Sequence, residues 1–151
     1  MLRDAIQAAT ITAMKAGDKP RVGALRLMSS AIKNRDIELR TGTAPADDDV
    51  MIAEVLAKMA KQRRESIEMF TAGNRLELAD AERAELAVIE SFMPAQMDAD
   101  AAQAAIAAIV AETGATSVKD MGKVMAVVKA RYAGQLDMGA AGAMVKAALA
   151  G

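Results

Sequence analysis

The side chains that could do chemistry in this chain are those of lysine, arginine, aspartate and glutamate, because its 151 residues include no cysteine and no histidine. Without a thiol, cysteine nucleophiles and cysteine-ligated zinc are excluded. Without an imidazole, the usual general base near neutral pH and the commonest metal ligand are missing. Ser-His-Asp and Cys-His mechanisms are therefore excluded, and an enzyme built from this chain would need a lysine, aspartate or glutamate with a shifted pKa.

The stretch TSVKDMGKVM, residues 116–125, places Lys119, Gly122 and Lys123 on one side of a predicted helix. A glycine inside a helix costs about 1 kcal/mol relative to alanine, so a surface helix gains nothing from Gly122 unless something approaches its backbone. Two explanations stay open. The first is structural: a neighbouring helix packs on Gly122 and Ala126, or the glycine serves a cap. The second is that an anion such as an RNA phosphate lies between the lysines. The opposite side carries the predicted apolar stripe, Val118, Met121, Met125, Val128 and Tyr132.

A second candidate is a polar strip, Gln62, Arg63 and Ser66, which interrupts the apolar face of the longest predicted helix. The strip could be a recognition surface, or its side chains could solvate a bend or bind the end of a neighbouring helix. Residues four apart on a helix are neighbours. We therefore expect Arg64 to pair with Glu68.

The next predicted helix is acidic, and carboxylates at helical spacing could hold a metal ion or perform acid–base work. Nothing else in the sequence converges on these residues, so we expect no metal and no cofactor. The residues concerned are Glu77, Asp80, Glu82, Glu85 and Glu90.

Glycine, proline and capping residues divide the chain into seven predicted helices, and no strand-like alternation of any length occurs. We therefore predict an all-α, multihelical protein. The helices are expected at residues 2–16, from Asp18 to near Gly42, from the acidic run 47–49 to Gly73, at 75–92, from Asp98 to Gly114, from Ser117 to about Ala130, and after Asp137.

A shift to alanine-rich composition after Pro94 predicts two parts. The first is a long-helix N-terminal subdomain at residues 1–94, and the second is a small three-helix C-terminal subdomain at 95–151, with FMPAQM as the hinge. Residues 1–94 hold 14 basic against 15 acidic residues, and residues 95–151 hold five against five. Neither half is basic, so nucleic-acid binding would require a local patch.

No segment reads as a signal peptide or as a membrane span. From this we expect a cytoplasmic protein with no membrane partner.

Three motifs, in this order and spacing, resemble the GatB/YqeY family over nearly the whole chain. They are LRLMSSAIKNRDIELR at 25–40, KQRRESIEMFTAGNRLELADAERAELAVIESFMPAQM at 61–97 and SVKDMGKVMAVVKARYAGQLD at 117–137. The resemblance implies an all-helical fold with two subdomains. In that family the same module forms the C-terminal tail of GatB, the tRNA-recognising subunit of the glutamine-dependent tRNA amidotransferase, whose reaction takes place in a separate domain.

The resemblance further implies that this chain is a free-standing, non-catalytic module that binds tRNA or a tRNA-handling protein complex. The family label is a carbon–nitrogen ligase with glutamine as amido-N-donor; no DNA partner is expected. The alternative is a helical protein–protein adaptor without RNA, which would use the polar strip. The residues implied in tRNA contact are Lys119, Gly122, Lys123, Lys129, Arg131 and Lys146, although the loop RYAGQLD departs from the family pattern at Tyr132 and Gln135.

Overall fold

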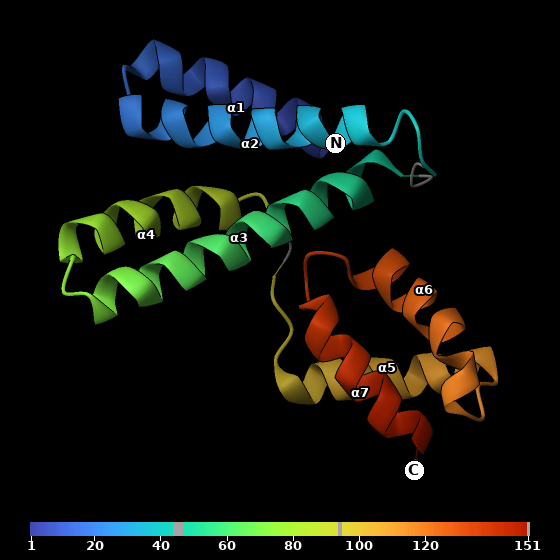
Figure 1. The fold of residues 1–151 in the computed structure, drawn as a ribbon. Coiled ribbons are helices and arrows are strands. Elements are labelled where there is room, and N and C mark those ends of the chain that lie inside the picture. Colours follow the sequence, from blue (N-terminus) through green and yellow to red (C-terminus); the bar gives the residue numbers. More distant parts are fainter. Residues whose placement is uncertain (44–46, 94, 151) are drawn as a thin grey trace. The chain divides into compact units, whose positions relative to one another are not determined.

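The computed structural model describes residues 1–43, 47–93 and 95–150, and within these ranges the chain forms α-helices and no strand. The predicted all-α fold is confirmed. The chain divides into two compact units, Met1–Met93 (unit 1) and Pro94–Gly151 (unit 2) (Figure 1). Pro94, at which the sequence places the subdomain boundary and the hinge, lies outside the described residues.

Unit 1 consists of two helical hairpins (Figure 1). Its helices are α1 (Leu2–Ala16), α2 (Lys19–Glu38), α3 (Asp48–Ala72) and α4 (Leu76–Glu90). Helix α2 contacts α1, α3 and α4, so it joins the two hairpins.

The predicted start and stop signals of unit 1 are mostly confirmed. Gly17 ends α1 in the left-handed region at φ 69°, which favours glycine. The Asp18 carboxylate accepts the backbone N–H of Arg21 at 3.2 Å and caps α2. Helix α2 ends at Glu38, before the predicted end near Gly42. The following residues continue as tight turns, in which the N–H of Gly42 donates to the carbonyl oxygen three residues back at 3.4 Å.

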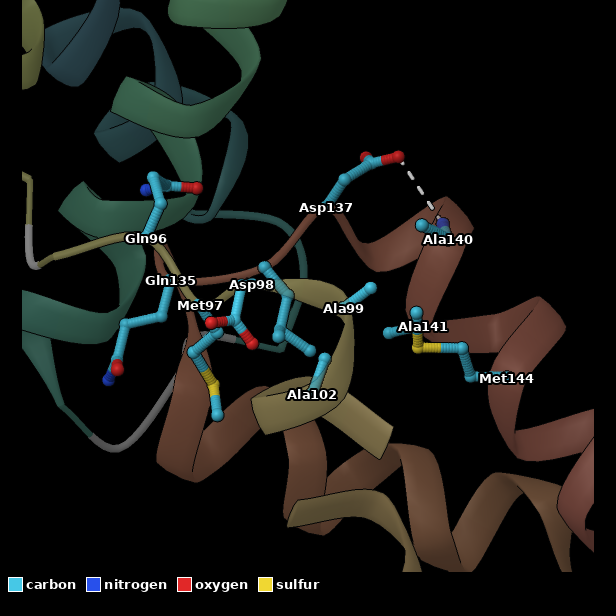
Figure 2. Close-up of a pocket in the computed structure, with 11 residues that line it drawn as sticks. Gln96, Met97, Asp98, Ala99, Ala102, Gln135, Asp137, Ala140, Ala141 and Met144 are labelled. Atoms are coloured by element: carbon cyan, nitrogen blue, oxygen red, sulfur yellow. Dashed lines mark hydrogen bonds between the residues drawn. The ribbon is translucent and has the colours of Figure 1, made fainter. Parts of the chain in front are cut away.

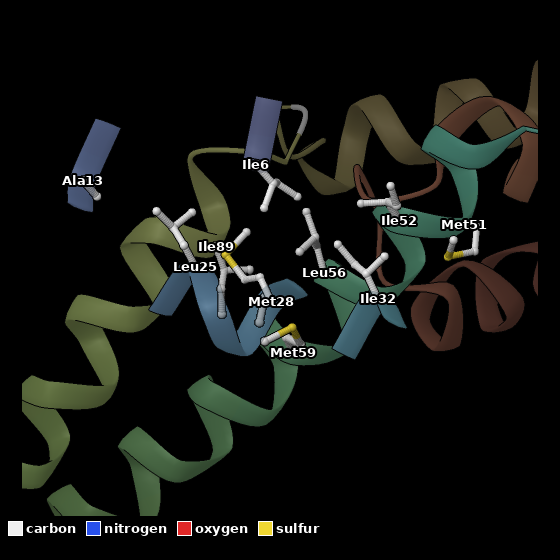
Figure 3. Close-up of a cluster of buried hydrophobic side chains, with 11 residues drawn as sticks. Ile6, Ala13, Leu25, Met28, Ile32, Met51, Ile52, Leu56, Met59 and Ile89 are labelled. Carbon is white, nitrogen blue, oxygen red and sulfur yellow. The ribbon is translucent and has the colours of Figure 1, made fainter. Parts of the chain in front are cut away.

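The core of unit 1 lies where α1, α2, α3 and α4 meet (Figure 3). Leu25, Met28 and Leu56 are fully buried in it, and no polar or charged residue is buried anywhere among the described residues. Burial of these large apolar side chains is the main stabilising term of the unit. The buried members are Ile6, Ala13, Leu25, Met28, Ile32, Met51, Ile52, Leu56, Met59, Ala60 and Ile89.

Unit 2 consists of α5 (Ala99–Thr113), a 3₁₀ turn η1 (Val118–Asp120), α6 (Met121–Tyr132) and α7 (Met138–Ala150). Asp98 and Asp137 cap α5 and α7 as predicted, by accepting backbone N–H groups at 2.7 and 3.3 Å. The core of the unit is built from smaller side chains: Ala102, Ile106, Ile109, Val124, Val128, Leu136, Ala141, Val145 and Leu149.

The start of α6 differs from the prediction. Ser117 and Asp120 form a capping box, but the first turn is 3₁₀, with three residues per turn. Val118 therefore does not continue the apolar stripe of α6: its exposed fraction is 43%, whereas Val124 and Val128 are fully buried.

No single helix within the described ranges is long and apolar enough to cross a membrane, although α5 taken with residues 118–132 passes on length and composition as a pair bent by 96°.

Candidate nucleic-acid interface

The start of α6 presents Lys119, Gly122 and Lys123 to solvent. Lys119 lies in the 3₁₀ turn, and the other two lie in the first turn of the α-helix. A Cβ added to Gly122 would meet no atom within 4 Å outside its own helix turn. The structure therefore does not support a neighbouring helix packed on Gly122, and the backbone here is open to a ligand.

The carboxylate of Asp120, next to this face, caps the helix start. Asp120 accepts the backbone N–H groups of Thr116 at 3.0 Å and Ser117 at 3.4 Å. These hydrogen bonds, with a smaller contribution from the charge of Lys123, lower the pKa of Asp120. Asp120 therefore stays ionised while it caps.

Lys119 and Lys123 form no ion pair among the described residues, although the charge of Lys123 acts on the nearby Asp120 carboxylate. Within residues 1–43, 47–93 and 95–150, none of the ion pairs includes Lys119, Lys123 or Lys146. An ammonium group that is not neutralised locally is available to an anion from outside. We call Lys119, Gly122 and Lys123 the lysine face. Lys129, in the last turn of α6, and Lys146, on α7, are also exposed.

Arg131, which the family resemblance also implicates, is held differently from the lysines. Its two terminal nitrogens donate to the two carboxylate oxygens of Glu112 on α5, at 2.7 and 2.9 Å. This two-pronged ion pair raises the pKa of Arg131 and lowers that of Glu112, chiefly through the hydrogen bonds. The guanidinium that could contact a phosphate is thus already occupied by a carboxylate of the same unit.

The polar strip does not form one surface. Arg63 is partly buried, and its Nε lies 2.7 Å from Glu85 and 3.3 Å from Glu82, both on α4. Arg63 therefore binds a neighbouring helix, although in the middle of that helix and not at its end as the alternative had it, while Gln62 is exposed and Ser66 is half-buried. Two carboxylates of the acidic helix α4 thus bind an arginine of α3.

The predicted pairing of Arg64 is wrong: its partner is Glu90 on α4, at 2.8 Å, and not Glu68 on its own helix. The packing of α3 against α4 brings Glu90 within reach of the long arginine side chain.

Two hollows in unit 2 were not predicted from the sequence. The first, of about 200 Å³, lies between the starts of α5 and α7 and the loop before α7 (Figure 2). The Met97 N–H donates to the carbonyl oxygen of Gln135 at 3.0 Å, and the Gln96 amide donates to that of Gly134. Its two carboxylates, Asp98 and Asp137, already cap helices. The carbonyl oxygen of Gln135 belongs to the backbone, which any residue supplies, so no side-chain pattern in the sequence pointed to this hollow.

The second hollow, of about 560 Å³, lies between α5 and α7. It is lined almost entirely by apolar side chains: Gln103, Ile106, Ala107, Ala143, Met144, Ala147 and Ala148. Alanines one turn apart in both helices were the corresponding sequence signal.

Fold and site together define a class of protein: a small, all-helical chain of two compact units, with a cationic helix start as its candidate site. The family can be stated as well. A family model described as Yqey-like protein matches residues 3–149, and the chain belongs to this family. The expectation drawn from the three motifs is confirmed at the level of the family.

Curated relatives include the protein named altered inheritance of mitochondria protein 41, mitochondrial. The Saccharomyces cerevisiae protein is 36% identical over 81 residues, covering 54% of this chain and 42% of the relative. The Lachancea thermotolerans protein is 31% identical over 81 residues with the same coverage, and the Eremothecium gossypii protein is 31% identical over 83 residues, covering 55% and 44%. The chain therefore spans less than half the length of these relatives.

These relatives are named as mitochondrial proteins, which contradicts the cytoplasmic location expected from the sequence. That expectation rested on not finding a targeting segment. Such an absence does not decide a location, least of all in a chain that covers 42% of its relatives.

Proposed function

We propose that this chain binds RNA, specifically tRNA, through the lysine face, and that it does so as a non-catalytic module. The observation that carries the proposal is the open backbone at Gly122 between Lys119 and Lys123, neither of which has an ion-pair partner among the described residues. Lysine is a point-charge binder of phosphate, and a missing side chain lets a phosphate come close to the helix backbone.

The choice of tRNA comes from the resemblance to the tail of GatB. Phosphate contacts position a nucleic acid without reading its bases, so the lysine face by itself would not distinguish one tRNA from another. We therefore propose that the chain acts together with a tRNA-handling complex, related to the glutamine-dependent amidotransferase, in which other groups select the tRNA. The net charge of −1 agrees with a local contact and not with bulk attraction to nucleic acid.

The direct test neutralises the lysine face in the full chain. Binding of unfractionated tRNA is measured for the double variant Lys119→Gln, Lys123→Gln. Glutamine is preferable to glutamate because a carboxylate at 123 would lie near Asp120 and disturb the cap. Each lost phosphate contact lowers the salt slope of log K by about 0.7 to 0.9, so two lost contacts lower it by about 1.5.

A matched control removes the same charge elsewhere. Lys33 and Lys58 are exposed on α2 and α3, and the double variant Lys33→Gln, Lys58→Gln should bind tRNA as the wild type does. If both double variants lose affinity equally, binding follows net charge and the lysine face is not the site. If the wild type shows no salt-dependent binding, the proposal of RNA binding fails altogether.

A protein–protein adaptor without RNA is the second candidate, and one observation favours it. Met69 near the end of α3 is 74% exposed and Leu76 at the start of α4 is 52% exposed. Large exposed apolar side chains occur at protein interaction sites. A pull-down treated with ribonuclease would keep its protein partners if the adaptor is correct, and Met69→Gln with Leu76→Gln would then release them.

A further inference from the structure

Glu112, which pairs with Arg131, differs in its position from the other acidic residues of unit 2. Asp98, Asp120 and Asp137 cap helix starts, and Asp100 lies in the first turn of α5. Negative charge is favourable in those places because of the helix dipole. Glu112 lies at the other end of α5, in the last turn before Gly114. A carboxylate there is disfavoured by the dipole, so helix stability does not explain Glu112.

The geometry of the pair matches that of an arginine with a phosphate. Both terminal nitrogens of Arg131 meet both oxygens of Glu112, at 2.7 and 2.9 Å, in the fork arrangement that carboxylates and phosphates share. The two side chains are about half exposed, at 48% and 53%, so an incoming anion can reach the guanidinium.

The pair also lies within reach of the lysine face. Arg131 follows Lys123 by eight residues on the same helix, which is about 12 Å along the helix axis. A continuous phosphate backbone can therefore contact both places at once. Lys129, two residues before Arg131, lies in the same last turn.

We propose that Glu112 is a built-in competitor for RNA: it occupies the guanidinium of Arg131 in the free chain, and an RNA phosphate displaces it on binding. The inference rests on the proposed function. Glu112 thereby weakens RNA binding and favours release of the RNA, since each RNA molecule must break the ion pair to reach Arg131. The lysines then provide the first contact and Arg131 the exchangeable one.

The test is the affinity of Glu112→Gln for unfractionated tRNA at several salt concentrations. Because an exposed ion pair contributes little, we expect the variant to bind about two- to fivefold more tightly. In the wild type, RNA binding frees the Glu112 carboxylate, which takes up a cation and so reduces the net release of cations. The variant lacks this carboxylate, so its salt slope should be steeper by up to about 0.9.

Two further variants separate this exchange from a general change in charge. Asp100→Asn makes the same charge change on the same helix without touching Arg131, and its gain should be clearly smaller. Arg131→Lys in the Glu112→Gln background keeps every charge but loses the fork, so it should reduce the gain to that of Asp100→Asn.

The exchange is overturned if Asp100→Asn gains as much as Glu112→Gln, or if Arg131→Lys keeps the full gain. It is also overturned if Glu112→Gln binds no better than the wild type. If neither the wild type nor any variant binds tRNA, the proposed function has failed, and the exchange with it. These outcomes are distinguishable because the wild type is measured in the same series.

Discussion

The two units of the molecule place most of their acidic side chains differently. In unit 1, arginines tie helices together: Arg3 reaches Asp36 and Asp48, and Arg63 reaches the carboxylates of α4. In unit 2, one such pair joins Arg131 to Glu112, but most acidic residues cap helix starts, and Lys119 and Lys123 form no ion pair among the described residues. The comparison indicates that a chain with almost no net charge can still present a cationic site, because the position of its acidic residues decides which cations remain available.

The cores of the two units also differ in the size of their buried side chains. Unit 1 buries methionines such as Met28 beside leucine and isoleucine, while the buried core of unit 2 contains alanine, valine, isoleucine and leucine and no methionine among the described residues. Smaller side chains let helices approach closely, but they bury less apolar area. Unit 1 is accordingly expected to be the more stable unit, and unit 2 the more adaptable one.

The largest effect should come from removing one core side chain in either unit. Leu56→Ala in unit 1 and Ile106→Ala in unit 2 each create a cavity at a fully buried position, and each should lower the free energy of unfolding by about 3 kcal/mol. Denaturant unfolding followed by hydrogen exchange would locate each loss. If each variant weakens only its own unit, the two cores are independent; equal loss of protection in both units would contradict this comparison.

An intermediate effect is expected from breaking the arginine contact between α3 and α4. Arg63→Met leaves Glu82 and Glu85 without their cation in a partly buried place, and we expect a loss of about 1 to 2 kcal/mol. The matched control is Arg83→Met, whose ion pair with Asp80 is exposed and should change stability by less than about 0.5 kcal/mol. Equal losses would show that burial of Arg63 adds nothing.

A smaller effect, with opposite signs, is expected from two glycines of unit 2. Gly122→Ala should stabilise the unit by about 0.5 kcal/mol, because alanine favours the helix and nothing lies near the added methyl. Gly114→Ala should destabilise it by about 1 kcal/mol, since its φ of 68° suits glycine. Thermal unfolding of both variants tests this. A destabilised Gly122→Ala would mean that the backbone there is not open.

The smallest effect concerns acid sensitivity. The pKa of Asp120 is lower in the folded chain than in the unfolded one, so its contribution is present above about pH 4 and is lost as the pH falls through the folded value. In unit 1, the hydrogen bond from Arg3 lowers the pKa of Asp48 in the same sense. Asp120→Asn should therefore reduce the fall in Tm of unit 2 between pH 7 and pH 3, as measured by thermal unfolding at both pH values.

The helices could be predicted from sequence because their signals are local. Asp18, Gly17 and Gly114 act within one turn of themselves, and the structure confirms all three. The 3₁₀ start of α6 could not be predicted, since the same capping residues fit an α-helical first turn. The lysine face is exposed as its helical spacing indicated, but which ligand it takes is not a property of spacing.

Contacts between helices escaped prediction because they depend on packing and not on sequence distance. Arg63 finds Glu85 across 22 residues, and Arg131 finds Glu112 across 19. In both cases an arginine that looked available in the sequence proved to be occupied. Long, flexible cationic side chains choose among all carboxylates within reach, and only coordinates reveal that set.

The methionines of unit 1 can report opening of its core through their oxidation. Met28 and Met59 are buried in the core, whereas Met69 is 74% exposed. Methionine oxidises to a polar sulfoxide where an oxidant can reach the sulfur, and the chain has no cysteine to compete for it. Under mild peroxide, Met69 gives the oxidation rate of an exposed sulfur, and Met28 is oxidised only while the core is open. The ratio of their oxidation rates therefore measures, without any introduced label, the fraction of time for which the core of unit 1 is open.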